Sequence, residues 1–308
     1  MKRAKGKSPP KKKAKKKQAK TIATQKKKGR RKVLTALPRI LAVAIGDPNN
    51  SRTINSIPSL TMPSLCRYYI LGMVDYLMNR PTPRLLGINY VIDYQECFEG
   101  GEVFTGTPNP ALILCMSTPV MRAAVNFTTQ SPIVGITSNP SAFAGNNNVC
   151  GVNAQRTNNP FTYYTHFKND LGGSTPITLL HRAGNAVSDA CRDGILQHVN
   201  VPVAPVDFPT GSDPRQPIIT AINTVNGGGL LVLPVDVFFG FSDTINSTAA
   251  QRGLTVFWPA QEFARRGPYH FGSSQVECGQ NFGAQADFIF TNHAVPTGNA
   301  RWKTVNPQ

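Results

Sequence analysis

Two groups of charged side chains in this sequence could do chemistry, and the first is a basic tract at its start. Residues 1–32 hold 17 Lys and Arg but no Asp or Glu. Lys-rich tracts neutralise phosphates and release condensed counterions, which gives strong, salt-sensitive binding that is blind to base sequence. No aromatic residue interrupts the tract, so it lacks stacking platforms for reading bases. The tract therefore predicts sequence-independent binding to nucleic acid.

The predicted phosphate-binding residues are all the cations of this basic arm. They are Lys2, Arg3, Lys5, Lys7, Lys11, Lys12, Lys13, Lys15, Lys16, Lys17, Lys20, Lys26, Lys27, Lys28, Arg30, Arg31 and Lys32. The runs KKKAKKK and KKKGRRK also match nuclear localisation signals and predict contact with a nuclear import receptor. A basic solubilising tail without a specific partner is the alternative.

The second charged group is the acidic cluster DYQECFEGGE, with Asp93, Glu96, Glu99 and Glu102. Its carboxylates could bind a divalent cation at contacts between subunits, because such cations prefer oxygen ligands. They could also receive basic residues of another copy. A solvated acidic loop is the alternative, and we favour it over a metal site. No other cofactor is expected.

The His and Cys residues predict neither a metal centre nor catalysis. None of the five His lies at ligand spacing with another His or Cys, and the six Cys form no CxxC pair. Cys150 and His166 could be imagined as a dyad, but many such pairs exist by chance. No nucleophile-elbow, zinc-protease or nucleotide-binding motif occurs, and Gly227–Gly229 precede an apolar strand, which predicts a turn. We therefore expect no catalytic residues and no enzyme.

The net charge of the chain belongs entirely to the basic arm. The whole chain has 33 Lys and Arg against 16 Asp and Glu, so removing the arm's 17 cations leaves a neutral body. The body has only two lysines, Lys168 and Lys303, and otherwise uses Arg, which suits packed contacts. If the chain assembles with copies of itself, Arg265 and Arg266 are candidates for contacts between subunits or for the inner surface of the assembly. No run of about 18 apolar residues occurs, so no membrane insertion is expected.

Short apolar runs separated by Pro, Gly, Asn, Ser and Thr must position these groups. We predict a helix over 183–199, where apolar residues are near helical spacing. We also predict a helix over 61–81, because its apolar residues do not alternate cleanly; a strand, favoured by Tyr68, Tyr69 and Ile70, is the alternative there. Asp189 and Asp193 share a face of the second helix, which favours solubility over catalysis. The predicted strands are 85–94, 111–117, 131–138, 176–181, 216–225, 228–241, 253–259 and 286–295. Many short strands with turn-rich connections predict a mainly β sandwich or barrel.

The organisation of a basic arm, an apolar hinge and a neutral body of short strands resembles the coat proteins of small non-enveloped icosahedral viruses. The resemblance implies an eight-stranded antiparallel jelly roll with one or two short helices. It divides the chain into a disordered arm over 1–32, a hinge over 33–60 and a shell domain over 61–308. The loops 139–148 and 209–217 would form the outer surface or the vertices.

The same resemblance implies function and location. The chain would self-assemble into a shell of about 60 copies or more and package single-stranded DNA or RNA through its arm. It would be found in virions, and in the host nucleus or cytoplasm during assembly. A cellular nucleic-acid-binding protein, ribosomal or chromatin-associated, is the alternative. An enzyme with a localisation tail is a third reading, although we find no catalytic cluster.

Overall fold

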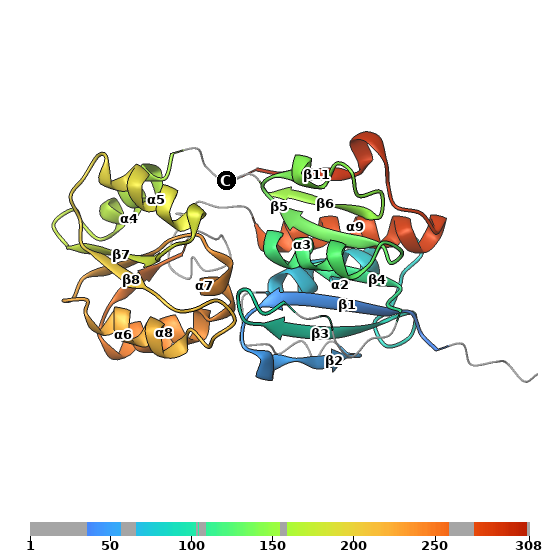
Figure 1. Ribbon diagram of the computed structural model, residues 1–308, viewed down its shortest axis with the longest axis horizontal. Helices are drawn as coiled ribbons and strands as arrows, with labels where there is room; N and C mark the ends of the chain where they lie inside the picture. The colour runs from blue at the N-terminus through green and yellow to red at the C-terminus, as the bar shows by residue number, and fades with distance from the viewer. Residues whose placement is uncertain are drawn as a thin grey trace, which may run out of the picture. The chain divides into compact units, whose positions relative to one another are not determined.

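The computed structural model describes residues 36–56, 66–102, 104, 109–154, 159–258 and 274–306. Within the compact unit Leu37–Gln308, the strands form two separate sheets, and each sheet is flanked by helices (Figure 1). We call the seven-stranded sheet with its helices lobe 1, and the four-stranded sheet with its helices lobe 2.

Lobe 1 is built on a mostly parallel sheet with the strand order β11-β6-β5-β4-β1-β3-β2. Only β2 runs antiparallel, against β3. The strands are β1 (Arg39–Ile45), β2 (Arg52–Ile54), β3 (Val91–Cys97), β4 (Leu112–Cys115), β5 (Ile133–Thr137), β6 (Val149–Ala154) and β11 (Trp302–Val305). In β1, every residue after Arg39 is buried, as expected of a parallel strand covered on both faces.

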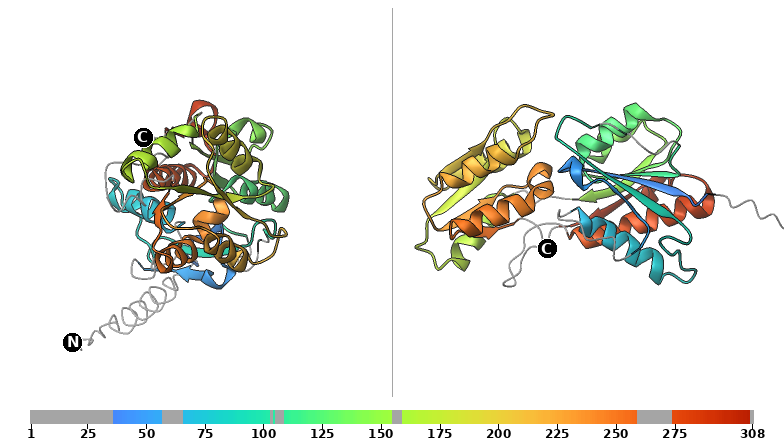
Figure 2. Two further views of the ribbon diagram at one scale, coloured as in Figure 1. Left: turned by 90° about the vertical axis from the view of Figure 1, so that its left-hand side faces the viewer. Right: turned by 90° about the horizontal axis from the view of Figure 1, so that it is seen from below.

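Helices cover both faces of the lobe 1 sheet. The helices α2 (Arg67–Asn79) and α9 (Gln275–Asn292) lie side by side on one face, and α3 (Thr118–Phe127) lies on the other (Figure 2, right). The pair α2 and α9 approaches closely because glycine lines the contact. A Cβ atom at Gly72 would meet the carbonyl oxygen of Val276, and one at Gly279 would meet that of Tyr69.

Lobe 2 is built on a fully parallel sheet with the strand order β10-β9-β7-β8. Its elements are α4 (Phe161–Asp170), β7 (Ile177–Arg182), α5 (Ala186–Leu196), β8 (Val203–Val206), α6 (Arg215–Asn223), β9 (Gly229–Val232), α7 (Asp236–Gly240), α8 (Ser242–Gln251) and β10 (Thr255–Phe257). The helices α4 and α5 lie together, and so do α6 and α8 (Figure 1). Short 3-10 turns are η1 (Pro48–Asn50), η3 (Pro140–Phe143) and η5 (Gly298–Ala300).

The two sheets share one winding order. In lobe 1, β1 lies between β3 and β4, and in lobe 2, β7 lies between β8 and β9. The chain therefore moves first to one side of the starting strand and then to the other, which creates a topological switch point in each sheet. Ligands of open α/β sheets bind outside the carboxyl ends of the strands at such points.

The prediction of an antiparallel jelly-roll shell domain over 61–308 is wrong, because the described strands are almost all parallel and helices alternate with them. The predicted strand 216–225 is mostly the helix α6, and 286–295 lies largely inside α9. The two predicted helices are present as α2 and α5. The apolar runs were correctly placed as buried segments, but their cover is helices rather than a second sheet.

The structure describes most of the predicted hinge but none of the predicted arm. Residues 1–32 lie outside the described part of the chain, so the arm stays a prediction. The segment 33–60 contains β1, in the interior of the lobe 1 sheet, and the short strand β2. The boundaries at 32 and 60 remain predictions. No helix of the described residues is long and apolar enough to cross a membrane.

All six cysteines are buried, so we expect their thiols to be unreactive in the folded chain. Burial raises the pKa of Cys97 and of Cys150 to about 12, because the thiolate is poorly solvated there. The folded state therefore holds these protons more tightly than the unfolded state. Its stability should fall as the pH rises above the ordinary thiol pKa of about 8.5.

The measurement is titration with Ellman's reagent at pH 8, with and without guanidinium. We expect no rapid reaction in buffer and six reactive thiols after unfolding. A thiol that reacts in the folded chain as fast as free cysteine would contradict this burial.

Candidate functional site

The carboxyl ends of the two sheets are joined by polar contacts at their switch points. Glu99 follows β3 in lobe 1, and its carboxylate accepts hydrogen bonds of 3.2 Å from Arg182 Nε and from Asn185 Nδ2 in lobe 2. The backbone N–H of Gly211 donates to the Glu99 carbonyl at 2.6 Å. A second ion pair joins Asp47, which follows β1, to Arg215 at 3.1 Å. These residues form the candidate site.

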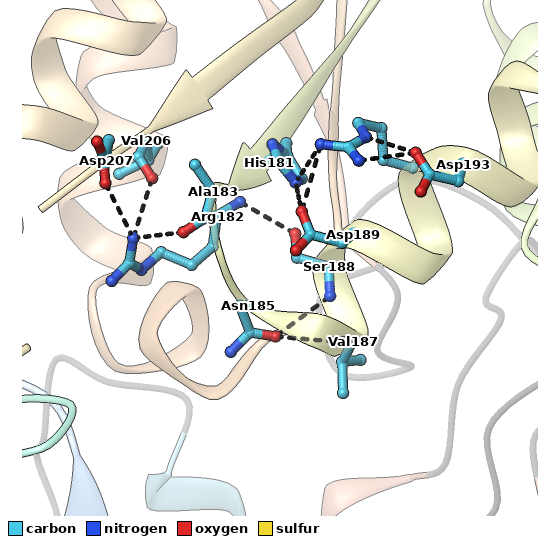
Figure 3. Close-up of polar contacts among 11 residues, drawn as sticks. His181, Arg182, Ala183, Asn185, Val187, Ser188, Asp189, Asp193, Val206 and Asp207 are labelled. Atoms are coloured by element: carbon cyan, nitrogen blue, oxygen red, sulfur yellow. Dashed lines mark hydrogen bonds and ion pairs between the residues drawn. The ribbon is translucent and has the colours of Figure 1, made fainter.

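Arg182 is the last residue of β7, and its side chain is held almost completely by backbone oxygens. Its Nη1 donates to the Ala183 carbonyl at 2.7 Å, and its Nη2 donates to the Phe208 carbonyl at 2.9 Å. The guanidinium also lies over the Phe208 ring, 3.7 Å from the ring centre. The side chain is only 7% exposed. Because β8 ends beside β7, these bonds fix the direction of the guanidinium, and Figure 3 shows its contacts with the Ala183 and Val206 carbonyls.

Asn185 is the N-cap of α5, and this role orients its amide group. Its Oδ1 accepts the N–H groups of Val187 and Ser188 at 3.1 and 3.2 Å (Figure 3). The Nδ2 group must therefore point away from the helix, where it meets Glu99. The turn before the cap needs Gly184, whose φ of 74° lies in the left-handed region.

His181 leaves β7 on the face opposite Arg182, as successive residues of a strand do (Figure 3). Its Nε2 lies 2.7 Å from Asp189 Oδ1, on the first turn of α5. Arg192 pairs with Asp189 at 3.3 Å and with Asp193 at 2.7 Å, and it lowers the pKa of Asp193. Asp189 and Asp193 thus serve an ion-pair network that attaches α5 to β7.

The predicted acidic cluster does not converge on a cation. Asp93 pairs with Arg39, Glu96 accepts from Tyr94 and Asn50, and Glu102 accepts from a backbone N–H in its own turn. Glu99 alone reaches lobe 2. Among the described residues, no group of three or more His, Cys, Asp or Glu could hold a metal ion.

The remaining predicted positions divide between described and undescribed residues. The 17 cations of the arm, together with Arg265 and Arg266, lie outside the described part of the chain. Cys150 is in β6 of lobe 1, whereas His166 is in α4 of lobe 2, so they belong to different sheets. The triple glycine at 227–229 forms the predicted turn into β9.

Sequence reasoning missed Arg182, Asn185, Asp47 and Arg215. It placed 209–217 on an outer surface, but this segment supplies Gly211 and Arg215 to the contacts with lobe 1. The signal available in the sequence was a charged residue within two positions of the end of several apolar runs. Asp47, Glu99 and Asp207 all follow a buried strand within two residues. Such residues gather only when the strands are parallel, which the sandwich interpretation excluded.

Several solved structures share this architecture. An ABC domain from Streptococcus pneumoniae in complex with L-Trp aligns with a TM-score of 0.55 and 13% identity, over 86% of this chain and 88% of that one. A sugar-binding LacI-family regulator from Enterococcus faecalis aligns with a TM-score of 0.51 and 10% identity, over 87% and 94%. The fold is periplasmic-binding-protein-like.

A third solved structure is a LacI-family regulator from a species of Arthrobacter, in complex with lactose. It aligns with a TM-score of 0.50 and 10% identity, over 89% of this chain and 97% of that one. No protein-family model matches the chain, and no curated protein matches it. At these identities the likeness establishes the fold alone.

This fold overturns the predicted viral function. The prediction of a virion coat protein that packages nucleic acid in a shell of many copies is wrong, because the chain has a periplasmic-binding-protein-like α/β fold and not an antiparallel jelly roll. The alternative of a ribosomal or chromatin-associated protein is wrong for the same reason. The expectation that the chain is not an enzyme stays a prediction.

Proposed function

We propose that this chain is a binding protein for a small polar organic molecule, held between the carboxyl ends of its two sheets. The observation that carries the proposal is the meeting of two switch points, at which Glu99 and Asp47 of lobe 1 pair with Arg182 and Arg215 of lobe 2. Switch points are where open α/β sheets bind ligands.

The groups at this edge define the kind of ligand. Both signs of charge are present, together with the amide of Asn185 and the backbone N–H of Gly211. Such a set can satisfy a ligand that carries several hydrogen-bonding groups, as amino acids and sugars do. The solved structures of this fold that contain L-Trp and lactose support the same size and polarity. No catalytic role is part of the proposal.

Thermal unfolding in the presence of a panel of amino acids, sugars and small organic acids tests the proposal. Ligand at about 100 times its Kd stabilises the folded state by about 2.7 kcal/mol, which raises the midpoint by several degrees. The Arg215→Met variant should lose most of that rise, because it removes the partner of Asp47. The matched Lys303→Met variant, at an exposed position of β11, should keep it.

A native mass spectrum of the purified chain adds a second readout, since tightly held ligands co-purify. If no panel member raises the midpoint and the spectrum shows only bare protein, the proposed function is contradicted. If Lys303→Met loses as much of the response as Arg215→Met, the ligand is not held at the carboxyl ends.

A further inference from the structure

Glu99 of lobe 1 occupies a pair of donors that is built to hold a carboxylate. Arg182 Nε and Asn185 Nδ2 each donate to a different oxygen of its carboxylate. Two donors on two oxygens of one group is the geometry by which proteins recognise carboxylates. We propose that this pair is the acid subsite for the ligand, so the ligand carries a carboxylate that takes the place of Glu99. The inference rests on the proposed function.

The first donor is fixed before any ligand arrives. The two terminal nitrogens of Arg182 already donate to the carbonyls of Ala183 and Phe208. Nε therefore remains for a group that approaches from lobe 1. Because packing and backbone bonds already hold the guanidinium, binding does not have to freeze a long side chain, and that entropy cost is avoided.

The second donor is fixed by the N-cap of α5. With Oδ1 of Asn185 bound to the N–H groups of Val187 and Ser188, only Nδ2 can face lobe 1. The cap turn is reachable from solvent, since Gly184 and Val187 are exposed. An incoming acid can therefore approach the same nitrogen that Glu99 now uses.

Glu99 is an imperfect occupant of this subsite. Hydrogen bonds between charged partners usually measure about 2.7–2.9 Å, whereas the Arg182–Glu99 contact is 3.2 Å. The position of its carboxylate is limited by its own backbone, which is held by β3 and by the hydrogen bond from the Gly211 N–H to the Glu99 carbonyl. A free ligand has no such restraint and can shorten both bonds. Two carboxylates at one donor pair repel, so the ligand and Glu99 exclude each other.

The neighbouring charges do not fill the subsite. Asp207 lies 3.6 Å from Arg182 Nη1, on the side away from Nε, and its side chain is 85% exposed, so water screens it. Glu102 accepts the N–H of Gly100 in its own turn. In the described part of the chain, Glu99 is therefore the carboxylate that a ligand must displace.

Carboxylate rescue tests the subsite directly. The Glu99→Ala variant vacates both donors, so acetate should raise its unfolding midpoint clearly more than that of the parent chain. Acetamide has the same shape without the charge and should have little effect. Sodium chloride at equal ionic strength corrects for salt. Glu99→Ser is the second variant if the alanine variant folds poorly, because its short side chain also vacates both donors while keeping a polar group in the turn, and acetate should raise its midpoint in the same way.

The Asn185→Asp change removes the second donor of the subsite without removing the cap of α5, so its effect on acetate binding is distinct from a loss of helix stability. Aspartate caps a helix as well as asparagine does, so α5 stays capped while an anion replaces the donor. In the Glu99→Ala background, this change should abolish the acetate effect. Equal responses to acetate and acetamide, or an acetate effect that survives Asn185→Asp, would overturn the subsite.

The outcome of the ligand panel is read separately. An acid found by the panel should bind Glu99→Ala at least about tenfold more tightly than the parent chain, because no internal carboxylate competes. A panel ligand without an acid group that binds Asn185→Asp at full affinity overturns the subsite and leaves the proposed function standing.

Discussion

Replacing Gly279 with alanine should lower the free energy of unfolding by about 3 kcal/mol, the upper part of the usual range for overpacking. The added methyl group would meet the backbone carbonyl of Tyr69, so α2 and α9 would have to move apart. In an exposed helix the same change would be favourable by about 1 kcal/mol, because alanine is the better helix former. The sign of the effect therefore reports the close approach of the two helices.

Urea unfolding followed by circular dichroism measures this change. Gly145→Ala is the matched control, because a Cβ atom there meets nothing within 4 Å. We expect the control to unfold within about 0.5 kcal/mol of the parent chain. A Gly279→Ala variant as stable as the control would mean that α9 does not pack on α2 in this way.

Replacing Arg301 with methionine should cost about 2–4 kcal/mol, because one guanidinium serves three carbonyls of the segment before β6 and one at the start of β6. Its nitrogens donate to the carbonyls of Val149, Ala144, Phe143 and Asn146 at 2.5–3.2 Å. Methionine fills similar volume but donates nothing, so partly buried carbonyl oxygens lose their partners. The loop between β5 and β6 and the pairing of β11 with β6 should loosen together.

Hydrogen exchange measured by mass spectrometry, alongside urea unfolding, localises this effect. Amides of the 140–150 loop and of β11 should exchange faster in Arg301→Met, whereas those of lobe 2 should not change. Lys303→Met removes a cation two residues further along the chain, at an exposed position of β11, and should have no measurable effect. Equally faster amide exchange in both lobes would contradict a local role for Arg301.

The sequence located buried segments well but not the way they pair. The runs in β1, β4, β7 and β9 are buried at nearly every position, because helices cover both faces of the sheets. A parallel α/β sheet produces this pattern, and so does a sandwich strand with a second sheet over its outer face. Periodicity within a run of four to seven residues cannot separate the two.

The sequence indicates the helices between the strands less clearly than it indicates the buried strands. The segment that forms α6, RQPIITAIN, has an apolar β-branched centre that favours a strand by propensity. It is helical because its one apolar face, with Ile218 and Ile222 four residues apart, packs on the lobe 2 sheet. Tertiary packing therefore overrode local preference. The candidate site was missed for the same reason, since Arg182 and Glu99 meet only through the parallel topology.

The basic arm dominated the functional interpretation although it makes up a small part of the chain. Its charge pattern is strong, and it predicts phosphate binding in many unrelated proteins. The resemblance to a shell subunit rests on this arm together with a neutral body of short apolar runs, and neither feature determines how the strands pair. The chemistry of an arm carries no information about the fold to which it is attached.

The order in which the lobes appear along the chain affects synthesis. Lobe 2 is one continuous stretch, 159–258, whereas lobe 1 needs α9 from the far end to cover the apolar face of α2. On a ribosome that adds about 5–20 residues per second, Ile70 and Met73 of α2 wait roughly 10–40 s for that cover. Lobe 2 can thus finish folding before lobe 1. Until α9 has been synthesised, the nascent chain exposes the apolar face of α2, to which chaperones can bind.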